Sequence, residues 1–301
     1  MSSTNQCPPK RAVIGLRRFR RKRRSAGLSF GAVFGTLRRM TAEKPAMACG
    51  RYVYGLGVMA LGMLGLAWGA FDPGQPVPMH VPGRSVLAYA SAAFMLVAGA
   101  AVVRRRTAAR GAAALAAYYA LIVVILMNGR VVLAHGAEFV TYSNLAEQLA
   151  IAAGGLIVFA ASARIDAAMA ARLAHSGRLA FGLCALLFGG AHFFYMNLTA
   201  PLVPRWLPPS QVFWGGATGA GQIAAGVAIL TGVRSRLAAI LLTAMYVSFA
   251  LLVWAPLLLA NPARHWIWSE NALNLALIGV AWVVADSLAG RGENPVQVTP
   301  V

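Results

Sequence analysis

Acidic residues are scarce in this chain, with 8 Asp and Glu against 27 Lys and Arg among 301 residues. Charged residues of both signs make up only 12% of the sequence, about half of the share that is usual in soluble domains. Hydrophobic residues make up 59%. So little charge and so much apolar surface favour a membrane protein over a soluble domain.

The chain also lacks the usual signatures of redox-active thiols and of nucleotide sites. Its cysteines, Cys7, Cys49 and Cys184, form no CxxC pair and have no histidine at a zinc spacing, which excludes thiol chemistry of the CxxC kind. We expect Cys184 to be a small packing residue. No Walker loop, dinucleotide fingerprint or HExxH motif occurs.

Histidines suited to haem ligation inside the membrane are missing as well. A transmembrane haem needs axial ligands, commonly two histidines on facing helices. Only His192 lies within an expected span, and the other histidines lie in or near expected loops: His80, His135, His175 and His265. We therefore expect neither a membrane haem nor another metal site.

Apolar runs of nearly membrane-spanning length follow one another from residue 50 onwards. Spanning a bilayer takes about 20 apolar residues. The sequence predicts an all-α membrane protein with eight transmembrane helices, at about 51–71, 85–103, 110–128, 145–163, 178–197, 211–230, 236–256 and 270–288.

Lys and Arg predict how these helices are oriented. If the amino terminus is cytoplasmic, only four of the 27 basic residues fall on the other side: Arg84, Arg130, Arg205 and Arg264. Because positive charge concentrates in cytoplasmic loops, both termini are expected in the cytoplasm. The basic excess is thus explained by orientation in a lipid bilayer, and we expect no nucleic-acid partner.

Two stretches of the chain resemble each other. Gly50, Arg51, Gly55, Leu56 and Gly62 correspond to Gly177, Arg178, Gly182, Leu183 and Gly189, and YSNLAEQLA (142–150) corresponds to WSENALNLA (268–276). Tyr119 matches Tyr246, and Ala98-Gly99 matches Ala225-Gly226. Because each unit has an even number of spans, both insert in the same orientation. We expect two tandem, parallel-related four-helix bundles, at 49–166 and 177–290.

The ends of the chain have a different composition. Residues 1–48 form a basic segment that we interpret as a disordered cytoplasmic tail, and residues 291–301 form a carboxy-terminal tail. Two alternatives for 1–48 are a transit peptide, or translation that natively begins at Met40 or Met47.

The loop-rich stretch 192–216 and two helix starts carry the candidate site residues. His192 and Tyr195 are spaced to share a helix face, and polar residues in spans usually face the bundle interior. On the same side of the membrane, two predicted helices begin with polar residues: Ser143, Asn144, Glu147 and Gln148, and Ser269, Glu270, Asn271 and Asn274. These groups predict an outward-opening polar pocket in each unit, with His192, Tyr195, Glu147, Glu270 and Asn274 as candidate functional residues. The alternative is that Asn144, Glu147, Ser269 and Glu270 only cap helices.

A glycine-rich first helix, a proline-rich outer turn and Ala-Gly late in the second helix resemble the DoxX family of bacterial membrane proteins. The similarity is better over 178–288 than over 50–165. It implies a location in the bacterial inner membrane. Some relatives, of the DoxD type, belong to a thiosulfate:quinone oxidoreductase, so the resemblance implies quinone as a candidate cofactor, with redox proteins as partners.

Three functions follow as hypotheses. The chain is a membrane subunit of a quinone-linked redox system, a small-molecule transporter working between its two units, or a non-catalytic scaffold or assembly factor. The sequence leaves open whether it is an enzyme.

Overall fold

The computed structural model describes residues 46–289, which form helices and loops with no β-strand. The expected basic tail at 1–48 and the carboxy-terminal tail at 291–301 lie almost entirely outside these residues. The helical elements are α2 (Ala46–Trp68), α3 (Arg84–Val103), α4 (Ala108–Ala117), η1 (Tyr118–Asn128), α5 (Gly129–His135), α6 (Phe139–Ser162), α7 (Ala167–Phe194), α8 (Met196–Thr199), η2 (Ala200–Leu202), α9 (Gln211–Thr231), α10 (Ser235–Phe249), η3 (Ala250–Trp254), α11 (Ala255–Ala260) and α12 (His265–Ser287).

Eight continuous helical runs within residues 46–289 are long and apolar enough to cross a membrane. Two of them contain more than one element: α4, η1 and α5 form one run, and α10, η3 and α11 form another. Large apolar side chains point outward along them, such as Leu126 and Leu133, which are 61% and 90% exposed. The expected all-α fold with eight spans is confirmed, and the chain is a multi-pass membrane protein.

Several helices begin earlier than hydropathy predicts. The run expected at 178–197 begins at Ala167, because the carboxylate of Asp166 accepts a hydrogen bond of 3.0 Å from the Met169 amide and so caps the helix. Likewise, α6 and α12 begin at Phe139 and His265 rather than at 145 and 270. Hydropathy locates the lipid-embedded part of a helix, whereas caps and intrinsic propensity set its ends.

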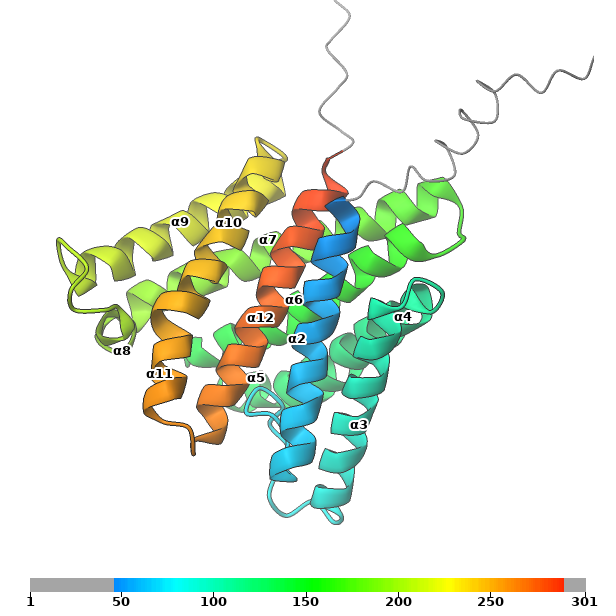
Figure 1. The fold of residues 1–301 in the computed structure, drawn as a ribbon, viewed down its shortest axis with the longest axis horizontal. Helices are drawn as coiled ribbons and strands as arrows, with labels where there is room; N and C mark the ends of the chain where they lie inside the picture. Colours follow the sequence, from blue (N-terminus) through cyan, green and yellow to red (C-terminus); the bar gives the residue numbers. More distant parts are fainter. Residues whose placement is uncertain (1–45, 290–301) are drawn as a thin grey trace, which may run out of the picture. The chain divides into compact units, whose positions relative to one another are not determined.

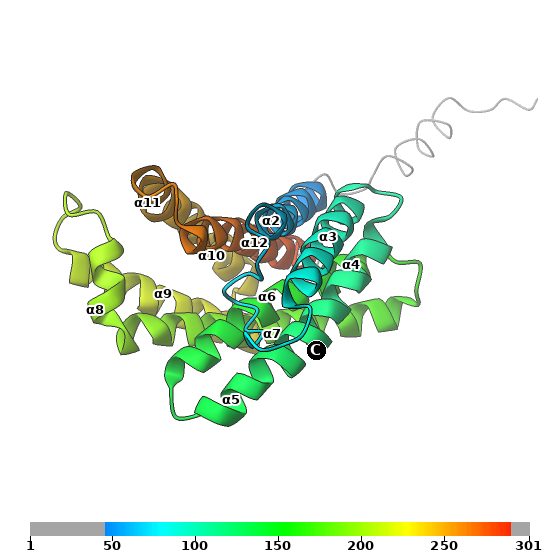
Figure 2. The ribbon, with the colours of Figure 1, turned by 90° about the horizontal axis from the view of Figure 1, so that it is seen from below.

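The first half of the chain, from α2 to α6, and the second half, from α7 to α12, exchange packing partners and so interlock. In Figure 1, α2 lies against α3 on one side and against α12, the last helix, on the other. Correspondingly, α6 packs on α7, and α6 also touches α12. Figure 2 shows the same arrangement turned by 90°, with α10, α12 and α2 in a row and α6 and α7 below them in the view. The first helix of each half thus packs on the last helix of the other half, which differs from two four-helix bundles each closed on itself.

Small residues permit these close helix contacts. A Cβ atom on Gly57 would overlap the backbone of Ala276, and one on Gly279 would overlap the backbone of Tyr54. Tyr54 is fully buried beside this crossing and donates a hydrogen bond of 3.0 Å to the Ile151 carbonyl. Glycine at such positions lets two membrane helices approach closely enough for dispersion contacts to hold them.

Matched positions in the two halves make matched contacts. A Cβ on Gly62 would lie 2.7 Å from the Ala92 carbonyl oxygen, and a Cβ on Gly189 would lie 2.5 Å from the Gly219 carbonyl oxygen. The first two helices of each half therefore pack through the same register. This agreement supports the repeat that the sequence predicts.

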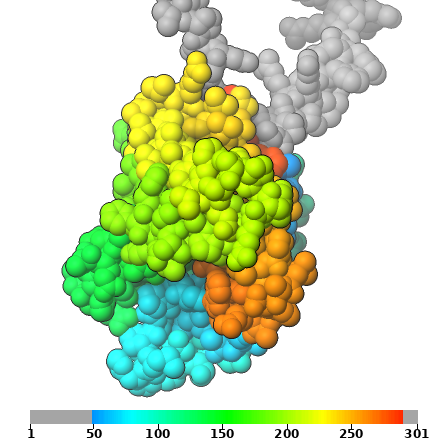
Figure 3. Space-filling model, turned by 90° about the vertical axis from the view of Figure 1, so that its left-hand side faces the viewer, coloured from blue at the N-terminus to red at the C-terminus, as the bar shows by residue number. Residues whose placement is uncertain are grey.

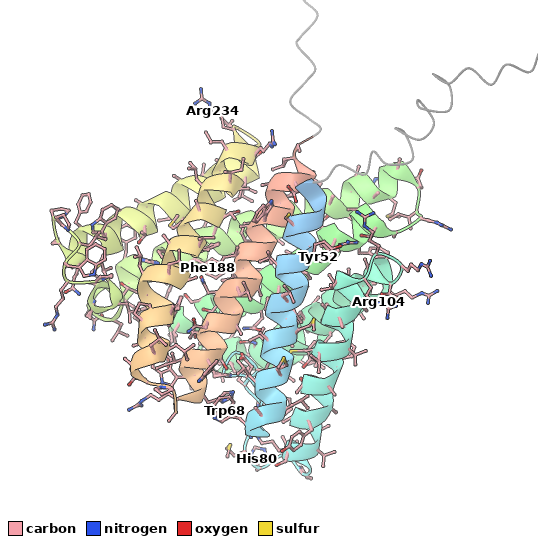
Figure 4. The ribbon with its side chains drawn as sticks, in the orientation of Figure 1. Tyr52, Trp68, His80, Arg104, Phe188 and Arg234 are labelled. Carbon is pink, nitrogen blue, oxygen red and sulfur yellow. The ribbon has the colours of Figure 1, made fainter. Side chains whose placement is uncertain are left out.

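The two ends of the helical assembly differ in how many arginines they carry. Figure 4 shows Arg104 and Arg234 at one end and Trp68 and His80 at the other. The candidate residues of α6, α7 and α12 lie toward the end that carries Trp68, which we call the arginine-poor end. This end holds Arg84 at the start of α3, Arg130 in α5, and Arg205 and Arg264 in the loops before α9 and α12.

Candidate functional site

A cavity of about 650 Å³ lies in the second half of the chain. Its walls come from α7, α9, α10, η3 and α12, with Ser143 and Glu147 added from α6. The segment after α7 covers one side through Thr199, Leu202 and Val203. In Figure 3 this segment, in yellow-green, lies beside α11, in orange. Figure 4 labels Phe188, a cavity-lining residue of α7, between α10 and α12.

The cavity has the composition of a small-molecule site. Most of its lining is apolar or aromatic, including Phe188, Phe249, Trp214 and Trp254. Ligand pockets typically have volumes of about 300–1,000 Å³ and combine apolar walls with a few well-placed polar groups. One wall includes η3, a short π-helix, and such segments occur frequently at functional sites.

His192 anchors a hydrogen-bonded chain along the cavity wall. Its Nδ1 lies 3.3 Å from the Thr218 hydroxyl, and its Nε2 lies 3.5 Å from Nε2 of Gln222. The Thr218 hydroxyl donates to the Trp214 carbonyl at 2.7 Å. His192 also stacks on Phe249, with ring centroids 6.1 Å apart. These contacts fix the orientation of the imidazole ring.

Three buried polar atoms on cavity-lining side chains have no hydrogen-bond partner among residues 46–289. They are Oε1 of Gln222, the hydroxyl of Tyr246 and the hydroxyl of Ser143. Gln222 and Tyr246 are each only 2% exposed. A buried polar atom without a partner costs about 1–3 kcal/mol. Three of them around one cavity indicate a place where a ligand completes the hydrogen bonding.

Carboxylates stand on the wall between the two halves of the chain. Glu147 of α6 and Glu270 of α12 both line the cavity and interact electrostatically with each other and with Asp72. Asp72 lies in the loop after α2, where burial raises the pKa of its carboxyl group, while a hydrogen bond of 2.9 Å from the Gly74 amide partly opposes this shift. The three carboxyl groups thus lie near enough to influence one another beside the cavity.

The other residues expected at the site take different places. Asn274 lines the cavity but donates its amide hydrogen bond, at 3.0 Å, to the Tyr246 carbonyl. Tyr195 does not line the cavity: α7 ends at Phe194, and the Tyr195 hydroxyl accepts a hydrogen bond from the Val140 amide at the start of α6. Of the five candidate residues, the cavity thus gathers four and leaves out Tyr195.

The capping interpretation of the acidic residues is wrong. Because α6 begins at Phe139 and α12 at His265, Asn144, Glu147 and Glu270 lie inside helices rather than at their first turns. The remaining polar residues make local contacts. Asn271 donates to the carbonyls of Trp254 and Ile267, Asn144 is exposed, and Gln148 packs beside Gly74.

In the first half, the side chains around the matching position hydrogen bond to one another. Tyr119, which matches Tyr246, donates a hydrogen bond to the Met95 sulfur at 3.1 Å, and Gln75 donates to the same sulfur at 3.4 Å. Ser91 and Tyr118 hydrogen bond to each other and to Oε1 of Gln75. The loop after α2 thus inserts Gln75 where the second half keeps a cavity. The expected pocket is present in the second half, and Gln75 occupies the matching place in the first half.

Sequence reasoning missed four residues of the site: Gln222, Thr218, Tyr246 and Asp72. Gln222 and Thr218 stand in GGATGAGQIAAG, which glycine content marks as a packing face. The signal was a glutamine in the middle of an apolar span, since polar side chains there are rare and usually functional. Asp72 lies in a loop, and its proximity to α6 and α12 depends on the interlocked packing.

Comparison with protein-family models, with curated proteins and with solved structures gives no match to this chain. Within residues 46–289, no group of three or more His, Cys, Asp or Glu side chains is arranged to hold a metal ion.

Proposed function

We propose that this protein is a DoxX-like multi-pass protein of a bacterial inner membrane, built from two tandem units, and that it binds a lipid-soluble quinone in the cavity of its second half. It serves as the membrane subunit of a quinone-linked redox system. Its termini lie in the cytoplasm, which agrees with the arginines gathered at one end of the helices.

The observation that carries this proposal is the combination of an apolar cavity with unpartnered polar groups. A quinone is a flat apolar ring with two carbonyl oxygens, which need hydrogen-bond donors. The cavity offers aromatic walls at Trp214 and Trp254, and hydroxyl donors at Tyr246 and Ser143. The first half, in which Tyr119 is already bonded to Met95, offers no such donor at the matching position.

Reduction of a quinone to a quinol consumes two electrons and two protons. We assign the supply of electrons to a partner redox protein. Glu147 and Glu270 place carboxyl groups in the cavity wall, and Asp72 links them electrostatically to a loop at the arginine-poor end. These residues are the proposed path by which protons reach the cavity.

Tryptophan fluorescence tests the binding step. The full chain in lipid nanodiscs is titrated with decylubiquinone, whose ring quenches nearby indoles. We expect saturable quenching that Trp214→Phe reduces. Trp206→Phe is the matched control, because Trp206 belongs to the same loop region but is 71% exposed and does not line the cavity.

The absence of saturable quenching would refute the quinone site and would leave the scaffold and transporter functions. Quenching that Trp206→Phe reduces and Trp214→Phe leaves intact would place the ligand outside the cavity.

A further inference from the structure

The orientation of the Gln222 side chain is set by a chain of hydrogen bonds that begins at a backbone carbonyl. The Thr218 hydroxyl has one proton, and its shortest contact is with the Trp214 carbonyl oxygen at 2.7 Å, so the hydroxyl donates there. Its oxygen can then only accept from His192, whose Nδ1 lies 3.3 Å away. The imidazole therefore carries its proton on Nδ1.

This tautomer determines what Gln222 can present to the cavity. A neutral imidazole that is protonated on Nδ1 has a lone pair on Nε2. The group facing that lone pair at 3.5 Å must be the NH₂ group of Gln222. The amide oxygen is then left over, and it has no partner among residues 46–289. Because the Gln222 side chain lines the cavity, its oxygen is an acceptor of fixed polarity in the wall.

The other unpartnered groups do not share this fixed polarity. The hydroxyls of Tyr246 and Ser143 rotate and can either donate or accept. They accommodate a carbonyl or a hydroxyl of the ligand equally well. Only the Gln222 oxygen distinguishes the two, because it accepts a hydrogen bond and cannot donate one.

We infer that Gln222, held by His192 and Thr218, makes the cavity selective between two forms of one aromatic ligand. The form whose ring carries a hydroxyl group donates a hydrogen bond to Gln222 and is preferred over the form whose ring carries a carbonyl group. The inference rests on the proposed function and adds the preferred form of the ligand, which for a quinone and quinol pair is the quinol. Gln222 is the specificity-determining residue, and His192 and Thr218 are positioning residues.

The first half supplies an internal comparison. The residue three positions before Ala98-Gly99 is Met95, and the residue three positions before the matching Ala225-Gly226 is Gln222. Met95 accepts hydrogen bonds from Tyr119 and Gln75 through its sulfur, so these two donors are already used within the first half. Methionine is therefore a side chain that the matching helix position already accommodates, which makes Gln222→Met a suitable variant.

Competition binding tests the selectivity. The full chain in nanodiscs is loaded with radiolabelled decylubiquinone and displaced by unlabelled decylubiquinol or decylubiquinone, without oxygen and without added reductant so that neither form is converted. An unmet buried acceptor weakens binding by about tenfold or more, so we expect the native protein to bind the quinol about tenfold more tightly. Gln222→Met should bring the ratio of the two affinities close to one.

Variants of His192 and Thr218 provide the decisive test. His192→Phe keeps a ring of similar size but removes the Nε2 lone pair that holds the NH₂ group of Gln222, so the amide is free to turn around. The preference should then be lost or reversed although Gln222 is unchanged. Thr218→Ser keeps the hydroxyl and should retain the preference, which separates positioning from a merely structural effect.

The outcomes distinguish this inference from the proposed function. Binding of neither form to the folded native protein would refute the quinone site and this inference with it. Binding of both forms with equal affinity, or a preference that His192→Phe leaves unchanged, would refute the selectivity alone.

Discussion

Replacing Gly279 by alanine tests the contact between α2 and α12, on which the interlocked fold depends. A Cβ at this position would overlap the backbone of Tyr54, and backbone atoms cannot rotate out of the way. Overpacking costs about 1–3 kcal/mol, and we expect the upper end here because two backbones must separate. Alanine recovers about 1 kcal/mol through its higher helix propensity. The expected net loss of stability is therefore about 2 kcal/mol.

Gly221 is the matched control. A Cβ there would lie 3.5 Å from the terminal methyl group of Met245, which is an ordinary contact. We expect Gly221→Ala to leave stability unchanged or to raise it by up to about 1 kcal/mol. Thermal unfolding of the full chain in one fixed detergent compares the two variants with the native protein. If Gly279→Ala unfolds at the same temperature as Gly221→Ala, the packing of α2 on α12 described above is wrong.

Three further predictions concern the site and the helix ends. Tyr119→Phe should lower stability by about 1 kcal/mol because it breaks a formed hydrogen bond, whereas Tyr246→Phe should weaken quinone binding and leave the unfolding temperature unchanged; the opposite pattern would refute the contrast between the halves. Burial raises the pKa of the Asp72 carboxyl, so the native protein should lose stability as pH rises above the ordinary value of 3.8, and Asp72→Asn should remove that loss when unfolding is measured from about pH 4 to pH 7. A slope that persists in Asp72→Asn would assign it to another group. Ser210→Ala should cost about 1 kcal/mol in thermal unfolding because the Ser210 hydroxyl caps α9, and an unchanged unfolding temperature would contradict that role.

The sequence predicts the membrane-embedded architecture well, because hydrophobic length is a local property. Eight apolar runs give eight helices, and Cys184 is buried as expected. Hydropathy places the starts of α6, α7 and α12 too late. It does not register the capping of α7 by Asp166 or the aromatic first turns that begin at Phe139 and His265.

The packing partners of the helices could not be read from the sequence in the same way. Similarity between the two halves predicts that each half has four helices, but it does not say whether α2 packs on α6 or on α12. Either arrangement buries a small-residue face. The choice depends on contacts distant in the sequence, such as Gly57 with Ala276.

The site was predicted in part, through its polar residues. His192, Glu147, Glu270 and Asn274 line one cavity, as their shared side of the membrane suggested. Tyr195 lies elsewhere, because the helix ends one residue before it and its side chain leaves the face of His192. The two halves differ at this position because the loop after α2 places Gln75 against Met95, Ser91 and Tyr118 in the first half.

Photoaffinity labelling tests most directly the claim that the second-half cavity is the quinone site. The full chain in nanodiscs is irradiated with an azidoquinone and digested, and the modified peptides are identified by mass spectrometry, with excess decylubiquinone as competitor. The account predicts competed labelling within 143–147, 188–222 and 244–277, which carry the cavity walls. Competed labelling confined to 86–128 in the first half, or labelling that the competitor does not reduce, would contradict it.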